Sequence, residues 1–306
     1  MSFRISRRSF VIGSASLPWL AACSSDDELD AEAAAERAAR IQGAHTAIGY
    51  AESQNGGRFG VSAVNLATGE TITHRGDERF AMCSSFKWLL AALVLQRVQA
   101  GDEALDRVIE FTEADMVSHA PVTQSALADG GLSVEALCRG TVQTSDNPAA
   151  NLLLRTLGGP EGFTAMLRAD GETTTRLDRW EPELNENAEG DPRDTTTPNA
   201  MVSLMGFYLF GAGLSAEYQT LLKDWMIGAS TGLTRLRAGI DAPWASGDKT
   251  GTSSNNQSND VAFAYKTAAP NDPILISSYL NVADPMSEET NALHATIGRQ
   301  IMWALG

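Results

Sequence analysis

Strand-type and helix-type segments are segregated along this chain, and this segregation constrains its fold more than any other feature. Short runs rich in β-branched and aromatic residues occur only near the two ends: 58–66, 70–75, 242–252, 260–267 and 273–282. The middle, about 83–228, carries apolar runs with helical spacing, and 287–305 has the pattern of an amphipathic helix. We therefore predict a two-lobe α/β fold. An antiparallel sheet of about five strands, built from both chain ends and flanked by helices, lies beside an all-helical lobe.

Composition limits the partners of such a fold. The 306 residues are 43% hydrophobic and carry a formal net charge of −15, which is a globular composition with an excess of acids. Nucleic-acid binding requires clustered Lys and Arg, so we exclude it. Beyond the N-terminal segment, no apolar run approaches the roughly 18 residues needed to span a membrane.

The segment 1–22 has the pattern of an export signal. Paired arginines precede a short apolar stretch, as in twin-arginine signals, and Leu20–Cys23 resembles a bacterial lipoprotein cleavage box. Cys23 is then either the lipidated residue or incidental to an ordinary cleavage nearby. Residues 23–40 are polar and acidic and suit a tether to a catalytic domain at 41–306. We expect an exported, periplasmic protein, anchored to the membrane if Cys23 carries lipid.

The helical middle opens with a polar group in front of an apolar run. Ser84 and Lys87 are three residues apart, so on a helix they share a face. A serine at a helix N-terminus meets outward-pointing N–H groups that suit an oxyanion, and a lysine with a lowered pKa can act as its base. A buried charged lysine is costly unless it is paired. Lys87 therefore either reaches solvent past the helix end or is held beside Ser84 for chemistry.

Two further motifs follow in order. The sequence S-D-N occupies 145–147, just before an apolar helix, and K-T-G occupies 249–251 in a strand-type run. The series S-x-x-K, S-D-N and K-T-G is the set found in class A β-lactamases and penicillin-binding proteins. From about residue 40 to its C-terminus the chain resembles this superfamily, which implies a β-lactamase/transpeptidase-like fold.

The segment between the S-D-N and K-T-G motifs distinguishes class A β-lactamases from penicillin-binding proteins. It contains Glu181 and Asn185, which match the residues that hold the hydrolytic water in class A β-lactamases and have no equivalent in the penicillin-binding proteins. An acyl-serine ester persists unless a base deprotonates a water aimed at its carbonyl, and a positioned base contributes roughly 10² to 10⁴ in rate. The resemblance also implies a cis bond at Glu181-Pro182 and an ion pair between Arg179 and Asp194 that holds the two ends of the loop.

The resemblance assigns the steps of the reaction to motif residues. Ser84 would attack the lactam carbonyl. Either Lys87 or Glu181, the latter through a water, would take its proton, and the sequence leaves this alternative open. Ser145, near Lys249, would pass a proton to the departing lactam nitrogen.

The resemblance also implies a substrate pocket around the nucleophile. The backbone N–H groups of Ser84 and Thr252 would form the oxyanion hole. Asn147 would hold the amide side chain of the substrate, and Thr250 and Thr252 would meet its carboxylate.

Two positions depart from the common family pattern. Many members place an arginine on the strand after K-T-G, where this chain has Ser258. We expect Arg235, in "STGLTRLRAG", to supply the cation instead, the alternative being an arginine on a helix surface. His119 stands where the family often has an aromatic residue at the pocket rim. We expect it to contact substrate, the alternative being a solvated side chain.

Beyond Cys23, only Cys83 and Cys138 remain. An exported location permits a disulfide between them, but both lie in apolar helical contexts where a thiol packs as a small hydrophobe, and we favour two free thiols. Cys83 precedes the nucleophile as in some carbapenem-hydrolysing relatives. The position of its disulfide partner in those enzymes is Ser253 here, and the usual mate of Cys138 falls at Ala91.

One competing motif is G-x-S-x-G at 228–232, the pattern of a nucleophile elbow around Ser230. That motif requires a strand before its serine. A helix-type run precedes it here, so we interpret it as a helix end and a turn. The four histidines show no zinc-ligand spacing, and we expect neither a metal nor another cofactor.

We therefore predict a class A serine β-lactamase that acts as a monomer on small β-lactam substrates and confers resistance to them. Two rivals are kept. One is a penicillin-binding peptidase or β-lactam sensor that only becomes acylated, and the other is a lipoprotein esterase that uses Ser230.

Overall fold

The computed structural model describes residues 24–306, with side chains from residue 29 onward. Cys23 and the predicted export signal lie outside the described residues. The chain divides into two compact units, one ending at Ala38 and one from Ala39 to Gly306. Helix α1 (Ser24–Asn55) begins within the segment expected to be a tether, and its residues 29–39 are exposed. None of the described helices combines the length and apolar character needed to cross a bilayer.

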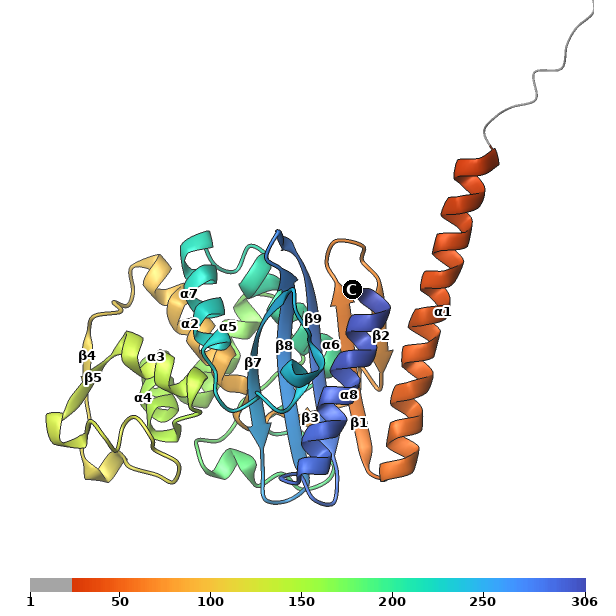
Figure 1. The fold of residues 1–306 in the computed structure, drawn as a ribbon. Coiled ribbons are helices and arrows are strands. Elements are labelled where there is room, and N and C mark those ends of the chain that lie inside the picture. Colours follow the sequence, from red (N-terminus) through yellow and green to blue (C-terminus); the bar gives the residue numbers. More distant parts are fainter. Residues whose placement is uncertain (1–23) are drawn as a thin grey trace, which may run out of the picture. The chain divides into compact units, whose positions relative to one another are not determined.

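The predicted five-stranded antiparallel sheet is confirmed, in the order β2-β1-β9-β8-β7 (Figure 1). Its strands come from both chain ends, as expected: β1 (Arg58–Asn65), β2 (Thr71–His74), β7 (Trp244–Thr252), β8 (Gln257–Lys266) and β9 (Ala269–Asn281). In the register of β7 against β8, Thr250 is opposite Asp260 and Thr252 is opposite Ser258. The K-T-G motif thus lies on an edge strand of the sheet.

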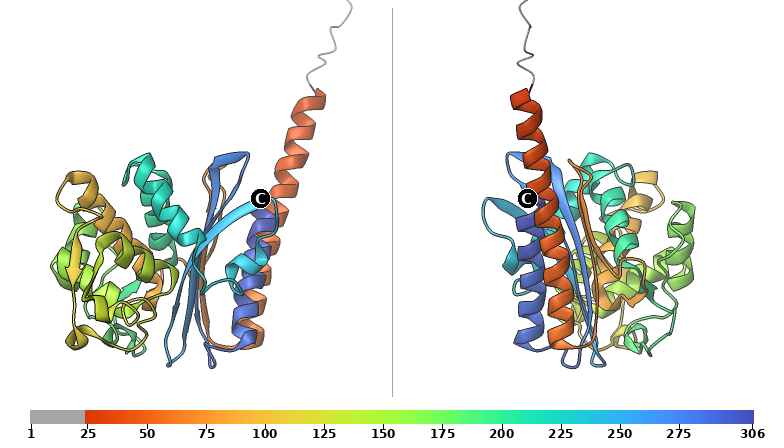
Figure 2. Two further views of the ribbon diagram at one scale, coloured as in Figure 1. Left: turned by 60° about the vertical axis from the view of Figure 1, so that its left-hand side comes forward. Right: turned by 90° about the vertical axis from the view of Figure 1, so that its right-hand side faces the viewer.

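Side chains alternate across the sheet and build two cores. Phe59, Ala262 and Ile276 face helix α8 (Glu288–Leu305), which supplies Ile297 and Ile301 to the same core. Figure 2 shows α8 on one face of the sheet and the helical lobe on the other.

The opposite face of the sheet meets the helical lobe. Val261, Phe263 and Tyr279 belong to the same core as the side chains of α2 (Lys87–Ala100), whose residues 87–95 are all buried. The other helices of the lobe are α3 (Val134–Gln143), α4 (Asn147–Leu157), α5 (Gly159–Ala169), α6 (Pro198–Met205) and α7 (Ala216–Ile227). Helix α2 is therefore the central helix against which the lobe packs.

The prediction of an all-helical lobe needs one correction. One small antiparallel ladder lies within it, where β4 (Val108–Glu110) pairs with β5 (Gly131–Ser133). A second joins β6 (Thr195–Thr196) of the lobe to β3 (Phe80–Ala81), just before it. Strands of two or three residues are too short to show an alternating pattern, so the sequence gives no sign of them. The β3–β6 ladder leads directly into the segment that carries Ser84.

Candidate active site

Ser84 lies in a 3₁₀ turn, Cys83–Phe86, that continues into α2. Cys83 has a φ of 45°, which is uncommon outside glycine. Strand β7 approaches this turn closely, because a Cβ added to Gly251 would lie 2.5 Å from Met82 O and 3.1 Å from Ser84 N. Only glycine permits this approach, and it brings the segment after K-T-G beside the serine.

Lys87 is fully buried, so the interpretation in which it reaches solvent is wrong. Its Nζ lies 2.9 Å from Glu181 Oε1 and donates to Ser145 O over 2.8 Å and to Asn147 Oδ1. Burial lowers the pKa of Lys87, and the charge of Glu181 opposes this effect. The ammonium is therefore held by a compact cluster of acceptors.

Glu181 connects the serine with the lysine. Its Oε1 accepts a hydrogen bond from Ser84 Oγ over 3.3 Å, and its Oε2 accepts one from Asn185 Nδ2 over 2.8 Å. Among the described residues, no hydrogen bond joins Ser84 Oγ directly to Lys87 Nζ; both bind the same carboxylate oxygen. The peptide bond between Glu181 and Pro182 is cis, as the resemblance implied.

The loop that carries Glu181 is closed by the predicted pair. Arg179 Nε lies 2.6 Å from Asp194 Oδ2, and the Asp194 side chain is fully buried. Asp194 Oδ1 also accepts from the backbone N–H groups of Asp178 and Arg179, while the guanidinium of Arg179 donates to Asn187 Oδ1 over 2.9 Å. A buried carboxylate thus joins the beginning of the loop to its end.

Ser145 faces the same cluster from the other side. Its Oγ lies 3.2 Å from Lys249 Nζ and 3.4 Å from Lys87 Nζ. Burial, followed by the charge of Lys87, lowers the pKa of Lys249 to about 7. The side chain of Asn147 is also engaged, since its Nδ2 donates to Ser118 O over 2.9 Å. The three motifs predicted from sequence therefore meet at one place.

Arg235 is buried beside β7, which excludes the interpretation as a surface arginine. Its Nη2 donates to Thr252 Oγ1 over 2.8 Å and its Nε to Asn291 Oδ1 over 2.9 Å. Among the described residues, no carboxylate forms an ion pair with it. Thr250, on the same strand as Thr252, donates from Oγ1 to Thr231 Oγ1 over 2.7 Å. A positive charge whose direct hydrogen-bond partners among the described residues are neutral lies next to the threonines expected to meet a carboxylate.

His119 is exposed, and its Nε2 lies 2.9 Å from Thr144 O. Ser230 is also exposed and follows helix α7, not a strand, which contradicts a nucleophile elbow and confirms the helix end and turn. Cys83 and Cys138 are buried free thiols, as predicted, and burial raises the pKa of each. Within residues 24–306, no three His, Cys, Asp or Glu side chains are grouped to hold a metal ion.

Sequence reasoning missed Asn151 on α4. Its Nδ2 donates to Glu181 O over 2.9 Å, and Glu181 N donates to its Oδ1 over 3.0 Å. The available signal was an asparagine four residues after Asn147 on an otherwise apolar helix, since that spacing places both side chains on one face.

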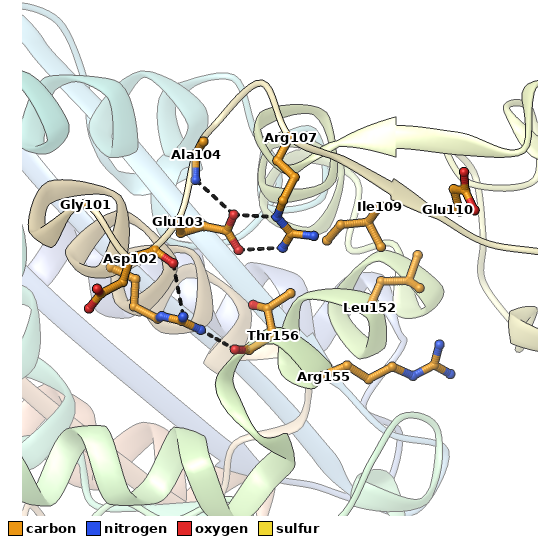
Figure 3. Close-up of a pocket in the computed structure, with 11 residues that line it drawn as sticks. Gly101, Asp102, Glu103, Ala104, Arg107, Ile109, Glu110, Leu152, Arg155 and Thr156 are labelled. Carbon is orange, nitrogen blue, oxygen red and sulfur yellow. Dashed lines mark hydrogen bonds and ion pairs between the residues drawn. The ribbon is translucent and has the colours of Figure 1, made fainter.

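A separate pocket of about 770 Å³ lies where α2 and α4 end (Figure 3). Several of its charged side chains already have partners: Arg107 Nη2 lies 2.5 Å from Glu103 Oε2, Arg97 donates to Thr156 O, and Arg155 pairs with Asp115. None of the motif residues lines it. This pocket is therefore separate from the catalytic motifs.

One carboxylate oxygen of the glutamate contacts both the serine and the buried lysine. This cluster lies between a helical lobe and an antiparallel sheet. Together they define a serine hydrolase of the β-lactamase/transpeptidase fold. The chain belongs to the beta-lactamase enzyme family, whose model matches residues 41–305.

Named relatives agree with this assignment. The chain is 41% identical to Beta-lactamase FAR-1 of Nocardia farcinica over 83% of its own length and 80% of that protein. It is 40% identical to the carbapenem-hydrolyzing beta-lactamase KPC of Klebsiella oxytoca, over 83% and 86% of the two chains. The structure of an ancestral class A beta-lactamase (GNCA) superposes with a TM-score of 0.82 at 46% identity, covering 85% of this chain and 99% of that one. The protein is a class A serine β-lactamase, which hydrolyses the β-lactam ring and so confers resistance; enzymes of this family are typically exported.

Proposed function

We propose that Ser84 is the nucleophile of this β-lactamase and that Glu181 activates the water that releases the product. The observation that carries the proposal is the distance of 3.3 Å between Ser84 Oγ and Glu181 Oε1, with Glu181 Oε2 fixed by Asn185. A base within hydrogen-bond distance of the nucleophile is the geometry that acyl transfer through serine requires.

In the acylation step, Ser84 Oγ attacks the lactam carbonyl and its proton passes to Glu181 Oε1. Lys87 binds the same oxygen through its ammonium, so it fixes the carboxylate in position for this transfer. The N–H groups of Ser84 and Thr252 bind the developing oxyanion. A proton passes through the Ser145 hydroxyl, which Lys249 also contacts, to the departing nitrogen. The proton on Glu181 replaces it through Lys87, whose Nζ contacts both Glu181 Oε1 and Ser145 Oγ.

In the deacylation step, the ester oxygen of Ser84 no longer carries a proton. Glu181, which is a carboxylate again once its proton has passed on through Lys87, can then accept a proton at Oε1 from a water next to the ester carbonyl. Asn185 Oδ1 is buried and has no hydrogen-bond partner among the described residues, so it offers a second acceptor for that water. Two acceptors orient the water's oxygen toward the carbonyl carbon. As the ester bond breaks, Glu181 passes the accepted proton to Ser84 Oγ, which restores the serine and clears the acyl-enzyme.

Substrate recognition follows from the charges around β7. The carboxylate of a β-lactam binds between Thr250, Thr252 and the two cations Lys249 and Arg235, and Asn147 binds its side-chain amide. The support for this placement is that Arg235 is buried and its hydrogen-bond partners among the described residues are neutral, since a buried cation with no directly paired carboxylate favours an anionic ligand. We also propose that His119 contacts substrate at the rim.

The test is to follow a chromogenic cephalosporin with the full chain and with Glu181→Ala. The unchanged enzyme should turn over many substrate molecules without added metal. In the variant, Lys87 loses the carboxylate that raises its pKa and can serve as the base for acylation, whereas deacylation has no base. Substrate mass should therefore accumulate on Ser84, located by digestion and mass spectrometry, and kcat should fall roughly 10² to 10⁴-fold. A single turnover by the unchanged enzyme would instead identify a β-lactam sensor, and undiminished turnover by Glu181→Ala would remove the assigned base.

We further propose that the protein is exported through its N-terminal signal, carries lipid on Cys23 and acts as a monomer. The support is the paired arginines and cleavage box described above. Cells that express Cys23→Ser should release the enzyme from the membrane fraction into the soluble periplasmic fraction. An unchanged distribution would contradict the lipid anchor, and a concentration-dependent mass in sedimentation would contradict the monomer.

A further inference from the structure

Asn259 on β8 connects the sheet to the segment that precedes the nucleophile. Its Nδ2 donates to Ala81 O over 2.9 Å and to Met82 O over 3.0 Å, and the side chain is fully buried. These two acceptors fix the amide orientation, because the reversed amide would place its oxygen against two carbonyl oxygens. One amide side chain thus binds two successive backbone carbonyls.

The segment that Asn259 holds adopts an uncommon conformation. The next residue, Cys83, has a φ of 45°, and such a conformation persists only where the surrounding structure imposes it. Met82 N also donates to Asp194 O over 2.9 Å, at the end of the loop that carries Glu181. Ser84 N, one of the proposed oxyanion donors, follows directly, so its direction depends on how this segment is held.

The backbone carbonyl of Asn259 contacts Arg235, the residue proposed to bind the substrate carboxylate. The carbonyl oxygen accepts from Arg235 Nη1 over 2.8 Å. The neighbours Ser258 and Asp260 point to the other face of the sheet, where they bond His294 and the N–H of Leu236. Asn259 alone of these three residues touches the nucleophile segment.

We infer that Asn259 is a positioning residue of the reaction: its amide aims the backbone N–H and the hydroxyl of Ser84, while its carbonyl orients the cation that receives the substrate carboxylate. This inference rests on the proposed roles of Ser84 and Arg235. Removing the amide should impair acylation and the oxyanion hole but leave substrate binding unchanged, because the backbone contact to Arg235 stays.

The test compares Asn259→Ala with the unchanged chain. We expect kcat to fall by roughly 10-fold or more, as small displacements of reacting groups cost about that much, while KM for a penicillin changes less than about threefold, since the contact from the carbonyl of Asn259 to Arg235 is retained. In a Glu181→Ala background, the acyl-enzyme should show its ester carbonyl band at higher wavenumber by infrared difference spectroscopy, because weaker hydrogen bonds polarise the carbonyl less. If Asn259→Ala does not fold, Asn259→Leu, which keeps the volume and lacks the donor, takes its place.

The matched control is Phe263→Leu, on the same strand and the same face in the core. It should lower the melting temperature without moving the carbonyl band or kcat. An unshifted band and unchanged kcat in the Asn259 variant would overturn the inference while leaving the proposed function intact. Absence of any adduct on Ser84 in Glu181→Ala alone would overturn both.

Discussion

Asn151 and Glu181 exchange two hydrogen bonds, from Asn151 Nδ2 to Glu181 O over 2.9 Å and from Glu181 N to Asn151 Oδ1 over 3.0 Å. The position of the glutamate is therefore set by helix α4 as well as by its own loop. Asn151→Ala should lower kcat by about 10-fold or more because the carboxylate loses its alignment with Ser84. Steady-state kinetics and the fraction of acyl-enzyme by mass spectrometry measure this effect.

The matched control for Asn151→Ala is Asn199→Ala. Asn199 donates from an exposed position to Asp77, away from the catalytic cluster, and its loss should leave kcat unchanged. Equal kinetics for the two variants would show that Asn151 does not position the glutamate.

Arg179→Ala should destabilise the protein, because it leaves the buried Asp194 carboxylate with only its backbone donors. Breaking a buried pair costs about 3 kcal/mol at the lower end of the usual range, which corresponds to a fall in Tm of roughly 6 to 12 °C. The control is Arg193→Ala, since the ion pair of Arg193 with Asp191 is exposed and should contribute little to Tm. Equal melting temperatures for the two variants would exclude the closing role of Arg179.

We expect kcat/KM to fall as the pH rises through the pKa of Lys249, which is lowered to about 7. Only the protonated ammonium attracts a carboxylate, so this contribution is complete below the pKa and is lost as the pH rises through it. Lys249→Arg keeps its charge at all working pH values and should move the basic limb of the profile to higher pH. A basic limb that stays in place would assign the titration to another group.

Arg235→Ala should raise KM for penicillins by about 10-fold, as expected when a buried charge-assisted hydrogen bond is lost. A penicillin methyl ester, which lacks the carboxylate, serves as the control on the substrate side, and its KM should not respond to the substitution. Kinetics that are unchanged for both substrates would show that another cation binds the carboxylate.

Ser230→Ala should leave activity unchanged, because Ser230 is exposed and donates to Gln143 O in a turn after α7. Hydrolysis of a chromogenic cephalosporin and of a simple ester checks this result. A loss of ester hydrolysis alone would reveal a second activity at this serine.

Much of the fold was predictable from local patterns. The strands and helices followed from periodicities of two and 3.6 residues, and the catalytic motifs from their order along the chain. Strands of two and three residues, such as β3 and β5, were not predictable because they leave no period. Such short ladders depend on tertiary contacts that bring two distant segments of the chain together.

The sequence by itself indicated the class of reaction, since it contains Ser84, Lys87 and Glu181 in motifs typical of class A β-lactamases. Only the tertiary structure decided how they are connected: one oxygen of Glu181 binds both the serine and the lysine. The supports Asn151 and Asn259 became visible only there. The physical reason is that a contact between residues far apart in the chain depends on packing and burial, which no local spacing records.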